Sequence, residues 1–137
     1  MQLIVYANPI VSILISPGKP IGVLFLEELE LFAPGLLFIE IENNKELIIQ
    51  KSKLTEEEIN RFIEILKQKI TVIPEEDFTN YLDLAERICP DKKDITYFAL
   101  ALHLKCTLWS NEKKLKEQKF VQVYATHDLI ELFNLSD

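Results

Sequence analysis

The chain has 137 residues and a net charge of -7, with 48% hydrophobic and 27% charged residues. This balance is typical of a folded globular domain and excludes a disordered or fibrous chain. The negative charge argues against a broad basic surface for nucleic acid, although an acidic site that binds divalent metal is compatible with a nucleic-acid enzyme.

Short β-rich runs alternate with helical patterns along the chain. In order, we predict a strand at 2–6, helices at 9–15 and 21–28, a strand at 29–33, a helical segment from 36 to about 50, a helix at 55–69, a strand at 70–73, helices at 75–88 and 94–105, a strand at 106–110, a short helix at 111–118, a strand at 121–125 and a closing helix at 127–133. This alternation predicts an α/β fold, with one domain over residues 1–137, a central parallel sheet of about five strands and helices on both faces.

The helix at 55–69 has the clearest local signals. Thr55 and Glu58 form a capping-box pattern, and apolar residues recur on one face. Asp94 stands at the N-cap position of the helix before the strand "CTLWS". In parallel sheets the ligand site lies beyond the C-terminal ends of the strands, so the residues just after each strand are the candidates for function.

Two cysteines, Cys89 and Cys106, lie in apolar stretches without CxxC or Cys/His spacing, so we expect buried free thiols in a reducing cytoplasm. Asn8 and Pro9 interrupt the first apolar run, and no basic segment precedes it, which argues against a signal peptide. No stretch approaches the ~20 apolar residues that span a bilayer. We therefore expect no membrane segment and a cytoplasmic location.

Several kinds of site lack support. The three glycines form no GxGxxG pattern, and a phosphate-binding P-loop is absent from the sequence. The two histidines, His103 and His127, have no spacing that would support a nucleophilic serine or cysteine. Dinucleotide binding and nucleophilic catalysis are thus disfavoured.

Three carboxylates are more informative. Glu40 interrupts an apolar helical segment, Asp94 opens a helix, and Glu112 follows the strand "CTLWS". If they meet at one sheet edge, they repel unless a cation or a proton lies among them. Such oxygen ligands suit Mg²⁺ or Mn²⁺ and would support metal-assisted phosphodiester hydrolysis. Taken singly, each acid has an ordinary explanation as a helix cap, a first-turn acid or a surface residue.

The chain resembles PIN domains, a nuclease family that includes many toxins of toxin–antitoxin pairs. The matching segments include "LIVYANPIVSILISPG", "LELFAPGLLFIEIENNKELI" and "PDKKDITYFALAL" followed by "LWSNEKKL". The resemblance implies a parallel α/β sheet, an acidic cluster that binds Mg²⁺ or Mn²⁺, and cleavage of single-stranded RNA. Carried over by position, Glu40, Asp94 and Glu112 are the catalytic and metal-binding acids, and Asn8 and Ser110 support them. Asp91 is an accessory acid or a solvated loop residue.

Tyr6 departs from the family pattern, which has an acid at this position. A neutral phenol is a poor ligand for Mg²⁺ at neutral pH. Glu112, where the family more often has Asp, keeps the charge on a longer side chain. Two hypotheses follow: a metal-dependent ribonuclease that uses the three remaining acids, or a catalytically impaired PIN domain that binds RNA or protein.

The partners expected from this resemblance are RNA, an antitoxin protein and a second copy of the chain. The apolar stretches 9–15 and "IGVLFL" suit a dimer interface or core packing equally well. The sequence leaves the substrate-binding residues unassigned. A run of lysines beside Glu112 offers phosphate contacts, or simply a solvated face: Lys113, Lys114, Lys116 and Lys119.

Overall fold

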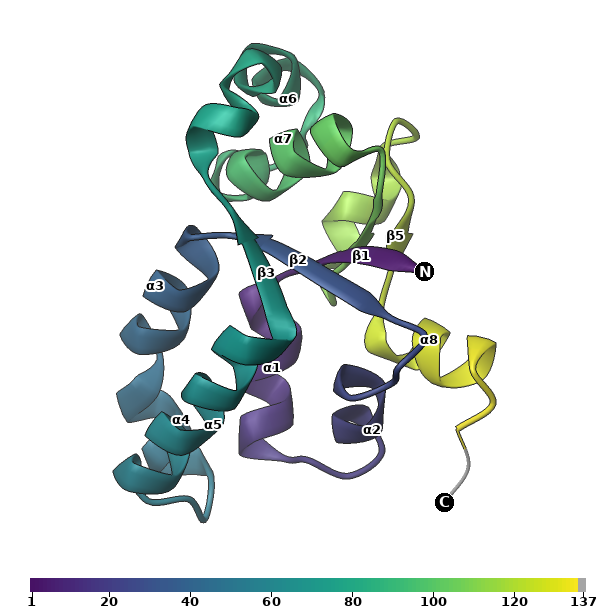
Figure 1. Cartoon of the computed structure of the whole chain (residues 1–137). Coiled ribbons are helices and arrows are strands. Elements are labelled where there is room, and N and C mark those ends of the chain that lie inside the picture. The colour runs from purple at the N-terminus through teal and green to yellow at the C-terminus, as the bar shows by residue number, and fades with distance from the viewer. Residues whose placement is uncertain (136–137) are drawn as a thin grey trace.

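The computed structural model describes residues 1–135 and shows a parallel sheet with helices on both sides (Figure 1). The strands are β1 (Gln2–Val5), β2 (Glu30–Pro34), β3 (Ile70–Ile73), β4 (Thr107–Trp109) and β5 (Val123–Tyr124). Their order across the sheet is β3-β2-β1-β4-β5, and every neighbouring pair is parallel. The predicted α/β class and five-stranded sheet are confirmed.

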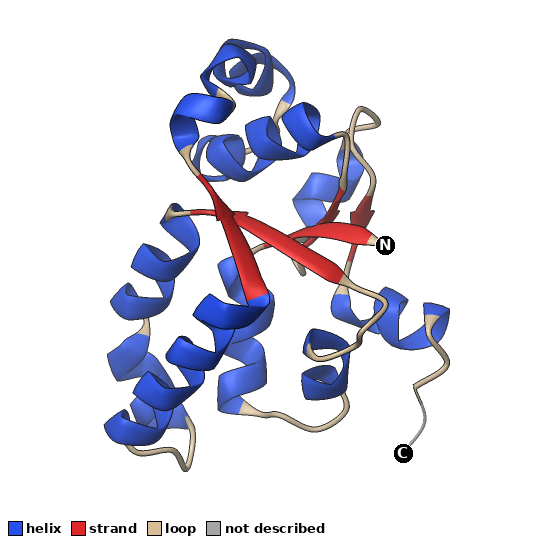
Figure 2. Ribbon diagram, viewed as in Figure 1, coloured by secondary structure: helices blue, strands red, loops and turns tan. Residues whose placement is uncertain are grey.

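Helices cover both faces of this sheet. The α-helices among the described residues are α1 (Ala7–Ile15), α2 (Pro20–Leu24), α3 (Leu36–Asn43), α4 (Lys45–Lys51), α5 (Glu56–Lys69), α6 (Leu82–Ile88), α7 (Ile95–Leu104) and α8 (Thr126–Leu132). Helices α6 and α7 lie on one side, and α1 to α5 lie on the other (Figure 2). Four 3-10 turns complete the elements: η1 (Glu75–Asp77), η2 (Thr79–Tyr81), η3 (Lys92–Asp94) and η4 (Lys113–Glu117).

The central strand and helix α7 form the middle of the core. Leu3, Ile4 and Val5 of β1 expose none of their surface, because β1 lies between β2 and β4 and is covered on both faces. Helix α7 packs between α6 and the sheet, and its residues 97–101 are all buried. This burial holds the C-terminal part of β1 and the middle of α7 in fixed positions.

The capping box of α5 is present as predicted. The Thr55 hydroxyl accepts a hydrogen bond from the backbone N–H of Glu58 at 3.1 Å, and the Glu58 carboxylate accepts one from the N–H of Thr55 at 3.0 Å. These two bonds satisfy donors that the helix leaves unpaired at its first turn. The buried stripe of α5 then includes Ile59, Ile63 and Leu66.

Other predicted helices are shorter or interrupted. The segment 36–50 divides into α3 and α4 at Asn44, whose side-chain amide donates to the carbonyl of Glu40 at 2.8 Å. The segment 75–88 begins with η1 and η2. There the Thr79 hydroxyl donates a hydrogen bond to the carbonyl of Glu75, which in an α-helix would accept from the backbone N–H of Thr79. The segment 21–28 is helical only to Leu24, because the chain then turns into β2. The helix predicted at 111–118 is the 3-10 turn η4.

The last strand is also shorter than predicted. The Gln118 side chain accepts a hydrogen bond from the N–H of Val121 at 2.9 Å and donates one to its carbonyl at 2.7 Å. These bonds remove Val121 from strand pairing, so β5 contains only Val123 and Tyr124. At Asp94 the N-cap position is as predicted, but the side chain makes no capping hydrogen bond.

Both cysteines are free thiols, as expected. Cys106 is buried, whereas Cys89 is only partly buried, which corrects the expectation of two buried thiols. Among residues 1–135, no helix combines the length and the apolar character needed to cross a bilayer.

Candidate metal and nucleic-acid site

A cleft of about 280 Å³ opens beyond the C-terminal end of β1. Its walls come from the end of β1, from α1 and α3, from the start of α7 and from the loop after β4. They are formed by Tyr6, Ala7, Asn8, Val11, Ser12, Glu40, Asn44, Lys93, Asp94, Tyr97 and Glu112. The cleft therefore brings together Tyr6, Asn8, Glu40, Asp94 and Glu112, whereas Ser110 and the accessory candidate Asp91 do not line it.

One part of the cleft, here called the tyrosine side, consists of Tyr6, Tyr97 and Glu40. The rings of Tyr6 and Tyr97 stack with centroids 4.0 Å apart and an interplanar angle of 22°. The Tyr97 hydroxyl donates a hydrogen bond to the Glu40 carboxylate, and the Tyr6 hydroxyl donates to the backbone carbonyl of Asp94 at 3.4 Å. The polar atoms on this side are therefore paired by the protein itself.

Both phenols are held in the neutral form. Burial, and then repulsion from Asp94, raises the pKa of Tyr6 well above 10. Burial and the hydrogen bond to Glu40 likewise raise the pKa of Tyr97. A phenolate that could bind a cation is thus unavailable at position 6 near neutral pH.

The other part of the cleft, here called the carboxylate side, consists of Asp94, Glu112 and Lys93, and Asp91 lies next to it, outside the wall. The Asp94 side chain is 5% exposed, and its Oδ2 atom is buried without a hydrogen-bond partner among the described residues. Burial raises the pKa of Asp94 to about 6, and repulsion from Asp91, Glu112 and Glu40 adds to the shift. A cation that reaches such a carboxylate stabilises its charged form.

Within residues 1–135, Lys93 is the only cation that partly balances the negative charge of the carboxylate side. Its Nζ lies 3.8 Å from an Asp91 oxygen and 3.9 Å from a Glu112 oxygen. The side chain of Lys93 is 66% exposed and that of Glu112 is 33% exposed, so these are loose pairs at the mouth of the cleft. Lys93 also opposes the rise in the pKa of Asp94, without cancelling it.

A hydrogen-bonded loop fixes the position of Glu112. Asn8 Nδ2 donates to Ser110 Oγ at 3.3 Å, and Ser110 Oγ accepts from the N–H of Glu112 at 3.1 Å. Asn8 Oδ1 accepts from the N–H of Asn111 at 3.0 Å, which ties the start of α1 to the loop after β4. Asn8 and Ser110 therefore hold the loop that carries Glu112, and their supporting role in a functional site remains a prediction.

Comparison with known protein families identifies the family of the chain. The family model described as "PIN domain" matches residues 4–123. This chain belongs to the PIN domain family. No curated protein sequence matches it significantly.

Solved structures share the fold of this PIN domain. A chain in the crystal structure of VapBC2 from Rickettsia felis bound to a DNA fragment from their promoter aligns with a TM-score of 0.70 and 16% identity, over 91% of this chain and 98% of that one. A chain of VapBC-1 from nontypeable Haemophilus influenzae aligns with a TM-score of 0.64 and 16% identity, over 93% of this chain and 99% of that one. At this identity the likeness establishes the fold.

The donor atoms of this PIN domain suit a divalent cation in part. Asp94 has an unpartnered buried oxygen and Glu112 a partly exposed carboxylate, and both fit an ion that prefers oxygen ligands. The Glu40 carboxylate is engaged by Tyr97. No three His, Cys, Asp or Glu side chains within residues 1–135 are grouped closely enough to hold a metal ion. The predicted three-acid ligand set therefore remains a prediction, and its best-fitting part is the pair Asp94 and Glu112.

Tyr97 and Lys93, the two wall residues whose side chains contact the predicted acids, were missed from sequence. Tyr97 lies three residues after Asp94 on α7, a spacing that puts both on one helix face, so this signal was available. Lys93 adjoins Asp94 in the chain, but its pairing with Glu112 depends on a contact across 19 residues that no local pattern indicates.

Proposed function

We propose that this protein is a divalent-metal-dependent endoribonuclease of the toxin type, which cleaves single-stranded RNA with Mg²⁺ or Mn²⁺ held by Asp94 and Glu112. The unpartnered, buried Oδ2 atom of Asp94 carries this proposal. A buried carboxylate without a partner is costly, and a cation is the ligand that relieves this cost. Membership of the PIN family supports the class of reaction.

The residues of the cleft have distinct roles in this proposal. When bound, the metal ion would activate water and stabilise the charge that develops on the phosphate. Asp94 and Glu112 provide its anionic ligands, and Asn8 and Ser110 hold Glu112 in place. Glu40 adds negative charge near Asp94, while its hydrogen bond to Tyr97 makes it a weaker ligand. With Tyr6 at the first position, we expect weak metal binding.

An antitoxin protein is the partner proposed for this toxin-type nuclease, and a homodimer is a further proposed assembly. The likeness in fold to chains of VapBC structures supports the former. A cytoplasmic location would place such a nuclease with its RNA substrate.

RNA cleavage with Mn²⁺ tests the proposal. We expect Asp94→Asn and Glu112→Gln each to lower the cleavage rate by about 100-fold or more, because each removes an anionic ligand. Asp83→Asn, which removes an exposed acid on α6, is the matched control and should cleave like the wild type. Equal cleavage by the wild type and Asp94→Asn would overturn the proposal.

The tyrosine side favours a second candidate function, a PIN domain that has lost catalysis and serves as a binding module. The stacked Tyr6 and Tyr97 rings leave no acid at the first position and engage Glu40. Calorimetry with Mn²⁺ separates the two functions. Heat of binding in Tyr6→Asp but none in the wild type supports the second candidate, and binding by the wild type excludes it.

A further inference from the structure

Three hollows adjoin one another across the surface beside β4 and β5. The first is the cleft, the second is a middle hollow of about 310 Å³, and the third is an edge hollow of about 730 Å³. Glu112 lines both the cleft and the middle hollow, and Lys116 lines both the middle and the edge hollow. The three hollows are therefore neighbours, and together they run from the carboxylate side to the open edge of the sheet.

Hydrogen bonds hold the two ends of the middle hollow together. Asn111 Oδ1 accepts from the N–H of Thr126 at 2.8 Å, and the N–H of Asn111 donates to Asn8. The Trp109 indole N–H donates to the Thr126 hydroxyl at 3.0 Å. These bonds connect α1, the loop after β4 and the start of α8, so the path has a fixed shape.

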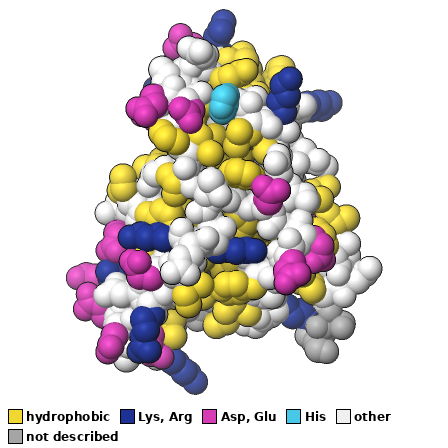
Figure 3. All heavy atoms as spheres, in the orientation of Figure 1, with side chains coloured by type: hydrophobic (Ala, Val, Ile, Leu, Met, Phe, Trp, Pro, Cys, Tyr) yellow, Lys and Arg dark blue, Asp and Glu magenta, His cyan; other side chains and the backbone are white. Residues whose placement is uncertain are grey.

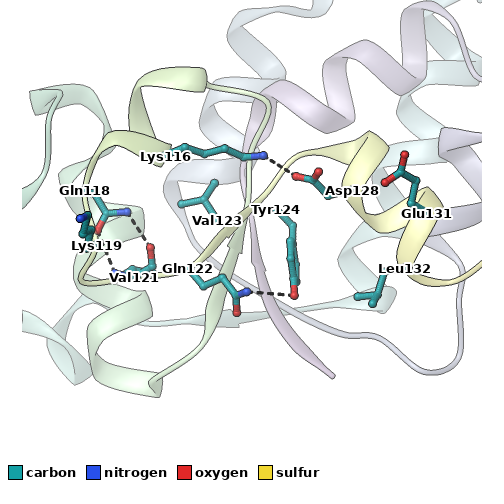
Figure 4. A pocket seen from close by; sticks show the side chains of 10 residues that line it. All are labelled: Lys116, Gln118, Lys119, Val121, Gln122, Val123, Tyr124, Asp128, Glu131 and Leu132. Atoms are coloured by element: carbon teal, nitrogen blue, oxygen red, sulfur yellow. Dashed lines mark hydrogen bonds and ion pairs between the residues drawn. The ribbon is translucent and has the colours of Figure 1, made fainter.

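Lysines lie along this path in a protein that is acidic as a whole. Residues 111–119 contain four lysines and two acids, while the chain carries a net charge of -7. Lys116 reaches across to Asp128 on α8 at 2.6 Å (Figure 4). Lys113 in the middle hollow and Lys119 in the edge hollow are exposed and have no ion-pair partner among residues 1–135. They offer two free positive charges, one on each side of Lys116.

The far wall of the edge hollow has the opposite sign. Asp128 and Glu131 of α8 face Lys116 and Lys119 across Tyr124 and Gln122, whose side chains hydrogen-bond to each other at 3.1 Å (Figure 4). A strand that carries negative charge along one edge can place this edge on the lysines, keep it away from Asp128 and Glu131, and set its uncharged groups on Tyr124 and Gln122. A single nucleic-acid strand has that form, with phosphates for the lysines and bases for the tyrosine ring and amide. A uniformly acidic peptide would meet repulsion from α8.

We propose that single-stranded RNA leaves the cleft over the loop after β4 and follows this path, with its phosphates on Lys113 and Lys119. The path from cleft to edge hollow is here called the lysine track. The proposal rests on the proposed ribonuclease function, since it assigns the contacts that hold the substrate of that site. In this proposal the edge hollow binds the part of the RNA that extends beyond the cleft.

Binding of a fluorescein-labelled oligouridine in EDTA, followed by anisotropy, tests the track without cleavage. We expect Lys113→Gln/Lys119→Gln to weaken binding about 3- to 10-fold and to lower the salt slope by about 1.4, the value for two lost contacts on a single strand. The control, Lys51→Gln/Lys53→Gln, removes two exposed lysines where α4 leads into α5. Acidic and basic side chains are intermixed on that part of the surface (Figure 3), so the control should bind like the wild type.

Two further arms sharpen the test. An oligouridine of about 12 nucleotides should lose affinity in the track variant, whereas one of about 4 nucleotides, too short to leave the cleft, should not. A polyglutamate peptide that binds more tightly than RNA, or equal weakening by the two double variants, would overturn the track. Cleavage lost in Asp94→Asn with the track variant binding normally would refute the track alone. Normal cleavage by Asp94→Asn with weakened binding by the track variant would refute the metal-dependent mechanism alone.

Discussion

The tyrosine side and the carboxylate side share one cleft, but they differ in how their polar atoms are satisfied. On the tyrosine side, the hydroxyls of Tyr6 and Tyr97 both have acceptors, and the rings stack on each other. On the carboxylate side, Asp94 keeps an unpartnered buried oxygen, and the nearest cation, Lys93, pairs loosely with the acids around it.

This difference separates a part of the site whose hydroxyls are satisfied within the protein from a part that leaves a buried carboxylate oxygen without a partner. A neutral aromatic pair gains its stability from packing and needs no ion. A buried carboxylate without a partner raises the free energy of the folded state until a proton or a cation arrives. With Tyr6 at this position, half of the site is satisfied without an ion, while the other half keeps an unpartnered carboxylate oxygen.

Tyr6→Asp should have the largest effect, because it places an acid on the tyrosine side. We expect the free energy of unfolding in EDTA to fall by about 5 kcal/mol, because the variant loses a packed ring and buries a charge beside Asp94. Excess Mn²⁺ should recover part of this loss, which urea unfolding with and without Mn²⁺ measures. Tyr6→Asn has the same size without the charge and should not respond to Mn²⁺. An equal response of the two variants would contradict the comparison.

Tyr6→Ala should show that the ring, rather than the hydroxyl, stabilises the tyrosine side. Loss of a buried ring is expected to lower the free energy of unfolding by about 3–4 kcal/mol. Tyr6→Phe should lower it by less than about 1 kcal/mol, since the hydroxyl makes one long hydrogen bond of 3.4 Å to Asp94. Urea unfolding of both variants gives the two values, and a larger loss for Tyr6→Phe would assign the stability to the hydrogen bond.

Asp94 should make the carboxylate side sensitive to pH. Its pKa of about 6 in the folded protein lies above its value of 3.8 when unperturbed, so the folded state binds the additional proton between these values. Its contribution therefore destabilises the protein at pH 7 by about 2–3 kcal/mol, and this penalty disappears as the pH falls from 7 to 4. Asp94→Asn should remove this trend, so the difference in unfolding free energy between variant and wild type should grow as the pH rises. A difference that stays constant from pH 4 to 8 would show that Asp94 is not destabilised in the apo cleft.

Lys93→Gln should give the smallest effect. The lysine is mostly exposed, so its loose ion pairs add little to stability. It does hold down the pKa of Asp94, which we expect to rise further in the variant. NMR titration of the Asp94 carboxyl carbon measures this change. Lys92→Gln, which alters the neighbouring exposed lysine outside the cleft, should leave the titration unchanged.

Features that depend on neighbouring residues could be predicted from the sequence. The capping box at Thr55 and Glu58 is one, and the strand at 70–73 is another, since both are set by local pattern. The convergence of Glu40, Asp94 and Glu112 on one cleft also followed from strand–helix alternation, which brings the C-terminal ends of parallel strands to one edge.

Features that depend on particular side-chain contacts could not. The truncation of β5 comes from the Gln118 side chain, which occupies the N–H and carbonyl of Val121; the two residues are near in the chain, but the apolar pattern of the strand does not indicate this bond. The engagement of Glu40 comes from a hydrogen bond to Tyr97, which lies 57 residues away. The sequence shows that Tyr6 is unusual, but only the stacked partner explains how a phenol is accommodated there.

The stack of Tyr6 and Tyr97 also bears on which side chains position 6 can accept. Tyr6 is 3% exposed and Tyr97 1% exposed, and both belong to the continuous hydrophobic core. A carboxylate at position 6 would lie in this core and disturb its packing before it could serve as a metal ligand. An acid there therefore requires compensating changes around α7, so the packing of the core restricts the chemistry that this corner of the cleft can carry.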